Sequence, residues 1–250
     1  KLGAEPDCCS TSVWTNPKYL GVWHMNTPYD ATLSANYQTN SAGNFDLPLT
    51  QDSKISLADN GMVGNTIVAK LGATSAIALF TTPHLPNSNL NTTGFVLSGW
   101  SYWKGNTATN PREVFIINPS AGSYKWQLYI SDKKLYSRFA TSGQQLGTNY
   151  IHKGWFHWSV RVSNKSKWDY YINGVWQQTR TTTQVKYINY MTTLKYSIGG
   201  EEGYTDEIRI HNIAASDDWI KAEYDSMKNA EFVTAAPAVR RPEPLQFIIR

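Results

Sequence analysis

Cysteine is nearly absent from this chain of 250 residues, which has only the adjacent pair Cys8 and Cys9. Neighbouring cysteines cannot cross-link distant segments, and a disulfide between them would be strained, since good bridges need ordinary Cα spacing. The sequence therefore excludes a disulfide framework. Free thiols or a local ring are expected for Cys8 and Cys9, because a redox site usually has residues between its two thiols.

Long apolar runs and blocks of like charge are also missing. Apolar runs such as residues 76–80 fall far short of the ~20 residues that cross a bilayer, so no membrane span is expected. Charged residues make up 17% of the chain, and 23 basic against 19 acidic residues give a net charge of +4. These charges are scattered, so the sequence shows no electrostatic footprint for nucleic acid.

Aromatic residues are abundant, at 13% of the chain, and many lie in alternating apolar and polar positions. In residues 124–131, Trp126 and Leu128 fall on one face and Lys125 and Gln127 on the other, the pattern of a half-buried strand. Similar runs, separated by Gly, Pro, Asn and Ser, predict an all-β, antiparallel sandwich. They cover residues 19–26, 67–70, 76–81, 95–103, 114–118, 135–140, 155–162, 168–172, 175–179 and 205–210.

Two local signals fix particular elements. Asn173-Gly174 lies between two strand-like runs, and this dipeptide favours the positive φ angles of a tight hairpin. Residues 216–228 predict one short helix near the end, because Ser216 can cap it and Asp217 and Asp218 complement its dipole. The expected core includes Trp23, Val96, Trp100, Trp126, Leu128, Phe156, Trp158, Val160, Ile172, Ile208 and Ile210.

The expected domain organisation is one sandwich with a short segment on each side. Residues 1–18 are expected to be a linker or the remnant of an upstream domain, and residues 19–232 the sandwich. Residues 233–250 are rich in Ala, Pro and Arg at their start, which predicts a linker or an added edge strand. Because the chain begins at Lys1 without a charged and then apolar leader, we expect it to be a processed or excised piece of a longer protein.

The order of several motifs resembles the laminin-G-like, concanavalin A-like domain of bacterial and archaeal surface proteins, over residues 19–232. The resemblance implies a jelly-roll sandwich, in the subgroup that follows a small β domain of unknown function. The motifs are Gly21-Val22-Trp23-His24-Met25-Asn26, the run 95–103, Gly154-Trp155-Phe156-His157-Trp158, Tyr171-Ile172-Asn173-Gly174-Val175, Ser197-Ile198-Gly199-Gly200, Thr205-Asp206-Glu207-Ile208-Arg209-Ile210 and residues 215–224.

Asp206 is the most informative polar residue. In a regular strand it shares a face with Ile208 and Ile210, while Glu207, Arg209 and His211 point the other way. A carboxylate on an apolar face needs a cation, an arginine or several backbone N–H donors. The resemblance implies a structural Ca²⁺ at Asp206, as in related jelly rolls. The alternative is a carboxylate held by hydrogen bonds or by an arginine.

The same resemblance places the other calcium ligands near Asn26 and Asp30 or Asp46. A calcium ion takes six to eight oxygen ligands, mostly from the backbone and from carboxylates. The Asp-rich turn of the family is matched only loosely by Asn44-Phe45-Asp46.

Tryptophan and tyrosine invite a carbohydrate-binding interpretation, because flat aromatic faces stack on sugar rings. Tryptophans inside alternating strands are expected to be core. The better ligand candidates lie near strand ends and turns, where a side chain can stay exposed. They are Trp103, Trp168, Trp176 and Tyr102.

Catalytic patterns are missing from the sequence. The Glu-x-Asp-x-x-Glu arrangement that places two carboxylates on one strand face in sandwich-fold glucanases does not occur. Glu223-Tyr224-Asp225 comes nearest, but it lies in the predicted helix, followed by Lys228. The histidines show no metal-ligand or triad spacing, and there is no phosphate-binding loop.

The expected function is therefore a non-catalytic recognition module, extracellular or on a bacterial or archaeal cell surface, that binds a glycan or a neighbouring protein. One alternative is a structural spacer, the outer domain of a cell-envelope assembly, since relatives with this ending are sometimes joined to proton-channel subunits of the TolQ and ExbB kind. A polysaccharide-cleaving enzyme is the third class.

Overall fold

The computed structural model of the chain describes a large part of residues 19–229. The described residues are 19–27, 32, 36–39, 41–42, 47–49, 55–59, 61–64, 66–69, 77–81, 94–105, 112–117, 126–139, 142–164, 167–181, 193–197 and 203–229. The segments 1–18 and 233–250, with Cys8 and Cys9, lie outside them, so the expected domain boundaries stay predictions.

Strands make up almost all the regular structure of this part of the chain, and α3 (Asp217–Lys228) is its one helix. The strands are β1 (Tyr19–Trp23), β2 (Asn36–Gln38), β3 (Leu47–Leu49), β4 (Ile55–Ala58), β5 (Thr66–Ala69), β6 (Ile77–Thr81), β7 (Phe95–Trp103), β8 (Arg112–Ile117), β9 (Trp126–Ser131), β10 (Lys134–Phe139), β11 (Ser142–Tyr150), β12 (Gly154–Asn164), β13 (Lys167–Ile172), β14 (Val175–Thr181), β15 (Thr193–Ser197) and β16 (Gly203–His211).

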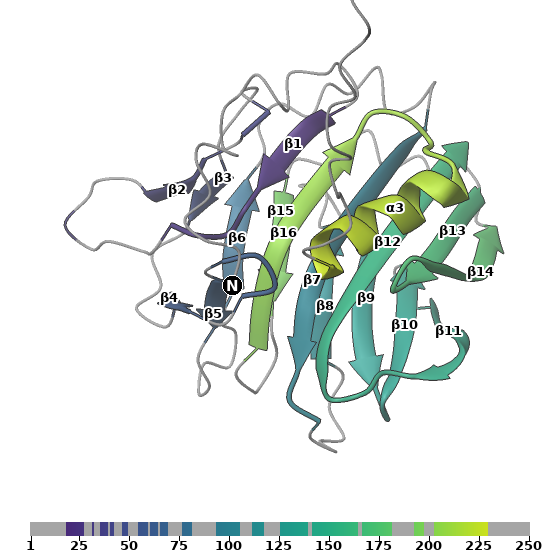
Figure 1. Cartoon of the computed structure of the whole chain (residues 1–250). Helices are drawn as coiled ribbons and strands as arrows, with labels where there is room; N and C mark the ends of the chain where they lie inside the picture. The colour runs from purple at the N-terminus through teal and green to yellow at the C-terminus, as the bar shows by residue number, and fades with distance from the viewer. Residues whose placement is uncertain are drawn as a thin grey trace, which may run out of the picture.

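Two antiparallel sheets form the layers of a sandwich (Figure 1). The larger sheet has eight strands in the order β14-β13-β12-β7-β16-β5-β4, with β1 also paired to β16. The smaller sheet has six strands in the order β11-β10-β9-β8-β15-β6, and β2 and β3 form a separate pair. The all-β, antiparallel sandwich predicted from the alternating pattern is therefore present.

Alternation in β7 and β12 divides the larger sheet into an inner and an outer face. Phe156, Trp158, Val160 and Val162 are buried, as the pattern predicts. The two sheets are joined by a buried hydrogen bond of 2.6 Å between the Ser137 hydroxyl of β10 and Tyr170 Oη of β13. Arg180 of β14 donates a second one, of 2.7 Å, to the Ser137 carbonyl.

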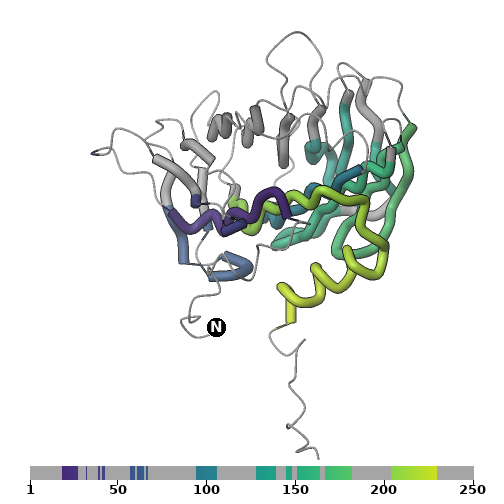
Figure 2. The backbone as a smooth tube through the Cα atoms, turned by 90° about the horizontal axis from the view of Figure 1, so that it is seen from above, coloured from purple at the N-terminus to yellow at the C-terminus, as the bar shows by residue number. Residues whose placement is uncertain are grey.

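Helix α3 lies on the outer face of the larger sheet, on the side away from the smaller sheet (Figure 2). Ser216 caps it as predicted, because its hydroxyl accepts a hydrogen bond of 3.2 Å from the Trp219 N–H. Ile220 is buried in a cluster with Val96 and Tyr171. Tyr224 stacks on Trp100, with ring centroids 5.5 Å apart and an interplanar angle of 25°. The outer face of β7 is therefore a second core, between sheet and helix.

The tight hairpin predicted at Asn173-Gly174 is present, and a second tight hairpin joins β9 to β10. Asn173 and Gly174 have φ angles of 51° and 74° between β13 and β14. Asp132 and Lys133 have φ angles of 49° and 63° between β9 and β10. Positive φ at both turn positions matches the twist of the flanking strands.

Most of the expected core is buried. Of the expected core residues, Ile172 is half-buried, and the side chain of Trp126 lies outside the described part.

Five strands of the structure were not predicted. They are β2, β3, β4, β11 and β15. Of these, β11 begins at Ser142, which pairs with Phe139 of β10. Pairing with the backbone of β10 forms this strand, although the sequence of β11 shows no apolar alternation.

Candidate functional site

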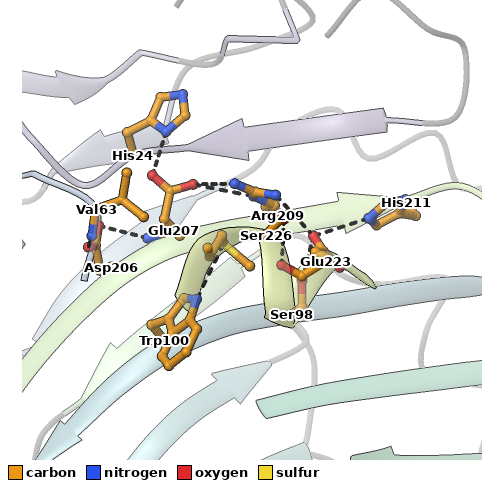
Figure 3. A network of polar contacts seen from close by, with 11 residues as sticks. His24, Val63, Ser98, Trp100, Asp206, Glu207, Arg209, His211, Glu223 and Ser226 are labelled. Atoms are coloured by element: carbon orange, nitrogen blue, oxygen red, sulfur yellow. Dashed lines mark hydrogen bonds and ion pairs between the residues drawn. The ribbon is translucent and has the colours of Figure 1, made fainter. Parts of the chain in front are cut away.

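A buried ionic network lies between β16 and α3 (Figure 3). Glu207 Oε2 accepts a hydrogen bond of 2.7 Å from Arg209 Nη2, and Glu207 Oε1 lies 2.6 Å from His24 Nδ1. Arg209 Nη1 reaches Glu223 Oε1 of the helix at 3.4 Å. These contacts join the segment after β1, the strand β16 and the helix.

Two further contacts surround Glu223. His211 Nε2 and the Ser98 hydroxyl lie 3.5 and 3.4 Å from Glu223 Oε1. The sequence placed Glu207, Arg209 and His211 on the face of β16 opposite to the core, but nothing in its pattern showed that this face is also buried. The helix covers it.

A β-bulge at Glu207 changes the face on which Asp206 lies. Asp206 pairs with Trp100 and Arg209 pairs with Ser98, so two residues of β16 stand opposite one residue of β7. Glu207 has a positive φ of 50°. Residues opposite each other in an antiparallel pair share a face, so Asp206 lies on the outer face with Trp100. The prediction that Asp206 shares a face with Ile208 and Ile210 is wrong, because the extra residue shifts the alternation.

Asp206 is held by backbone groups. The N–H groups of Val63 and of Glu207 each donate to one carboxylate oxygen, both at 2.9 Å. Burial raises the pKa of Asp206 well above its usual value, and the nearby charge of Glu207 adds to this, against the opposing effect of the backbone donors. This carboxyl group has the hydrogen-bonded environment expected as the alternative to calcium.

The structure does not test the other proposed calcium ligands as a set. Asn26 is exposed, and Asp30 and Asp46 lie outside the described residues. No group of three or more His, Cys, Asp or Glu side chains that could hold a metal occurs in the part of the chain that the structure describes. Calcium at Asp206 therefore stays a prediction.

The buried location of the network shifts the pKa values of its members. Burial alone would raise the pKa of Glu223, but its hydrogen bond to His211 and the charges of His211 and Arg209 lower it to about 2. Burial would also raise the pKa of Glu207, but the Arg209 guanidinium and His24 lower it. The carboxylates are therefore ionised and paired. Glu207, Arg209 and Glu223 are all buried, so this network is a set of internal ion pairs.

The aromatic residues proposed as ligand-binding platforms differ in exposure. Trp103 is only 5% exposed and Trp168 only 2%, so the expectation that their rings stay exposed is wrong. The ring of Trp168 instead packs edge-on against Phe95, at a centroid distance of 6.2 Å. Trp176 is 51% exposed and its neighbour Val175 57%, which keeps Trp176 as a candidate.

Tyr102 is half-buried and belongs to an aromatic cluster that the sequence pattern does not predict. We define the aromatic cluster as Tyr102, Trp155 and Tyr204, which come from the neighbouring strands β7, β12 and β16. Tyr102 lies edge-to-face with both partners, at centroid distances of 5.6 Å to Trp155 and 5.1 Å to Tyr204. Lys104 Nζ lies 5.7 Å from the centroid of the Tyr204 ring.

The signal for this cluster lies in the sheet register. Tyr102 stands opposite Trp155 in one pair and opposite Tyr204 in the other, so all three side chains share the outer face. All three are half-buried. A sequence shows that each residue is close to a strand end, but only the strand order shows that the three meet.

By its fold and its site, the protein is an all-β sandwich that carries the aromatic cluster and a buried ionic network. No protein-family model and no curated protein sequence matches the chain. Among the described residues, no helix has the length and apolar character needed to cross a membrane.

Solved structures share the fold. The binding domain of Paraclostridial Mosquitocidal Protein 1 is 14% identical, with a TM-score of 0.64 over 84% of this chain and 52% of that one. Botulinum neurotoxin type C, whose cell entry depends upon interaction with two ganglioside molecules, is 14% identical, with a TM-score of 0.66 over 88% and 53%. The binding domain of botulinum neurotoxin DC, solved in complex with rat synaptotagmin II, is 14% identical, with a TM-score of 0.63 over 84% and 52%.

At this identity the similarity shows the fold alone. The chain spans about half the length of the structures it matches.

Proposed function

We propose that this chain is a non-catalytic recognition module that binds a glycan, and that the aromatic cluster Tyr102, Trp155 and Tyr204 is its platform. The observation that carries the proposal is the meeting of three half-buried rings from three strands on one face. Edge-to-face packing fixes the rings relative to one another, so little conformational entropy is lost when a sugar stacks on them.

The similar structures support a binding role. They include two domains named for binding, one of them in complex with rat synaptotagmin II, and a toxin whose cell entry depends upon interaction with two ganglioside molecules. We propose that the module acts outside the cell or on a bacterial or archaeal surface. We also propose the jelly-roll connectivity and the laminin-G-like relationship that the sequence motifs imply.

A glycan array followed by alanine substitutions tests the proposal. Trp155→Ala and Tyr204→Ala should each weaken binding about tenfold, since a stacked ring contributes on the order of 1 kcal/mol or more. Trp219→Ala is the matched control, because Trp219 is 43% exposed on α3 and lies outside the cluster. Unchanged melting temperatures would show that the variants fold.

Two outcomes would contradict this assignment. A glycan that binds the Trp155→Ala and Tyr204→Ala variants as tightly as the wild type would place the binding surface elsewhere. A blank array would favour the structural spacer, the outer domain of a cell-envelope assembly.

A neighbouring protein is the second candidate ligand, favoured by the exposed pair Val175 and Trp176 at the start of β14. As consecutive strand residues they point to opposite faces of β14, and a large exposed aromatic side chain such as Trp176 is typical of protein contacts. Trp176 also remains a candidate sugar platform from its place beside a turn. Trp176→Ala distinguishes the two ligands: reduced binding in the glycan assay assigns Trp176 to the sugar, and reduced binding to an adjacent domain of the full-length protein assigns it to a protein contact.

A further inference from the structure

A loop held by Asp206 covers part of the outer face of the larger sheet. We define the anchored loop as residues 61–64, between β4 and β5, which lie on the same side of the sheet as α3 (Figure 2). Its Val63 N–H donates a hydrogen bond of 2.9 Å to Asp206 Oδ2 (Figure 3). Just after the loop, the Thr66 hydroxyl donates a buried hydrogen bond of 2.6 Å to the Thr205 carbonyl. Two consecutive residues of β16 therefore fix the loop.

The strand register places this loop next to the aromatic cluster. Tyr204 and Asp206 of β16 stand opposite Tyr102 and Trp100 of β7. Both residues of β16 therefore lie on the outer face, about 7 Å apart along the strand. Tyr224 of α3 stacks on Trp100, and the anchored loop contacts Asp206. The helix and the loop thus cover one row of side chains, and the next row is the aromatic cluster.

The aromatic cluster has about the width of a single sugar ring. Its ring centroids are 5.6 Å apart for Tyr102 and Trp155, 5.1 Å for Tyr102 and Tyr204, and 6.1 Å for Trp155 and Tyr204. A second ring of a longer glycan therefore has to rest on a neighbouring surface. The anchored loop offers one, because Met62 and Val63 are half-buried and methionine adapts its shape to a contact.

We infer that the anchored loop is a second subsite beside the aromatic cluster, for the second ring of a glycan, and that Asp206 is the positioning residue that holds the loop in place. The inference rests on the proposed glycan-binding function and adds the extent of the site. Asp206 acts through the loop, because its carboxyl group is fully buried and accepts hydrogen bonds from the N–H groups of Val63 and Glu207. Without this anchor, the loop would have to be ordered when the glycan binds, which costs conformational entropy.

The experiment compares two monosaccharides with their disaccharides: glucose with cellobiose, and N-acetylglucosamine with chitobiose. A chelator is present throughout, so that no calcium ion can hold Asp206. In at least one pair, the disaccharide should bind the wild type about tenfold more tightly than the monosaccharide. Asp206→Ala should remove this advantage and leave the monosaccharide affinity unchanged. A loss of stability alone would not produce such a split.

Ser137→Ala is the matched control, because it also removes a buried hydrogen bond, the one of 2.6 Å to Tyr170, but in the smaller sheet. It should leave the disaccharide advantage unchanged. Amide hydrogen exchange at Val63 should accelerate severalfold in Asp206→Ala without any sugar, which reports release of the loop. Asp206→Asn keeps one acceptor for the loop and should retain part of the advantage. It makes the same comparison if Asp206→Ala does not fold.

The other outcomes overturn the inference in distinguishable ways. Equal affinity for monosaccharide and disaccharide in both pairs overturns the second subsite and leaves the proposed function intact. If Asp206→Ala weakens both members of a pair equally, or leaves exchange at Val63 unchanged, the positioning role is wrong. If none of the four probes binds, an array hit for another glycan overturns this inference alone, and a blank array overturns both proposals.

Discussion

Glu223 connects helix and sheet through the ionic network, and its removal leaves Arg209 without one of its two carboxylate partners. Loss of one partner from a buried ion pair costs about 3–5 kcal/mol, because the remaining charge stays buried. We therefore expect Glu223→Ala to lower the free energy of unfolding by about 3 kcal/mol in denaturant titrations.

Asp225→Ala is the control on the same helix. Asp225 pairs with Lys221 at the surface, where such pairs contribute at most about 1 kcal/mol. Equal losses in the two variants would contradict the role assigned to the buried network.

Two buried residues at the contact between α3 and the larger sheet make stability depend on pH in the same direction. Burial lowers the pKa of His157 from 6.5 to about 4, and Arg209 adds to this against the opposing effect of Glu223. The neutral form is favoured in the folded state, so its contribution is complete above pH 6.5 and is lost as the pH falls toward 4. The pKa of Glu223, lowered from 4.5 to about 2, adds a contribution that is complete above 4.5 and is lost below it.

The free energy of unfolding should therefore decline as the pH falls from 6.5 to 4, and His157→Gln should reduce the slope over this interval. Denaturant titrations at several pH values measure both. A slope that the substitution leaves unchanged would assign the decline to other groups.

Asp206 decides the calcium prediction. An ion bound only by the native state raises the melting temperature as its concentration increases above its dissociation constant. If calcium is bound, melting with calcium and with a chelator will differ for the wild type and coincide for Asp206→Asn. Equal melting temperatures for the wild type would mean that the backbone donors alone hold this carboxylate.

The β13–β14 hairpin shows how a turn can be fixed both locally and by its neighbours. Gly174 has a φ angle of 74°, and an added Cβ would lie 3.1 Å from Tyr224 Cδ1 and 3.2 Å from the Cα of Lys221. Gly64 has nearly the same φ, 73°, with nothing within 4 Å of an added Cβ. Both positions carry the backbone cost of a positive φ, about 1 kcal/mol, but only at Gly174 would the added Cβ also crowd α3.

Gly174→Ala should therefore destabilise the protein more than Gly64→Ala, by roughly 1 kcal/mol or more. Equal losses would show that Tyr224 moves aside at no cost. Thermal unfolding of both variants in one buffer makes the comparison.

The sequence predicted the elements that depend on interactions between neighbouring residues. Asn173-Gly174 and the Ser216 cap each act over a few residues, and both appear in the structure as expected. The bulge at Glu207 has no comparable signal, because its alternation continues regularly in the sequence. The aromatic cluster and the ionic network depend on strand order, which joins residues far apart in the chain. Of the tryptophans expected to be exposed platforms, only Trp176 is exposed. The period-two pattern does not show which strand ends are covered by other elements.

At the scale of the whole molecule, β7 and β12 lie in the middle of three layers. The smaller sheet covers their inner face and α3 covers their outer face, whereas β14 ends the strand order of the larger sheet (Figures 1 and 2). Nearly all of the residues of β7 are buried, while the first two residues of β14 are exposed. Stability against local opening is highest where backbone hydrogen bonds are buried on both faces.

Amide hydrogen exchange should therefore be slowest in β7 and β12 and faster in β14, with α3 between them. The Glu223→Ala variant separates local from global opening. If the ionic network mainly holds the helix on the sheet, exchange in this variant should speed up most in α3 and in the outer-face residues beneath it, while β9 and β10 of the smaller sheet keep their protection. A uniform acceleration in both sheets would instead mean that helix and sandwich unfold as one cooperative unit, with the network contributing to the stability of the whole.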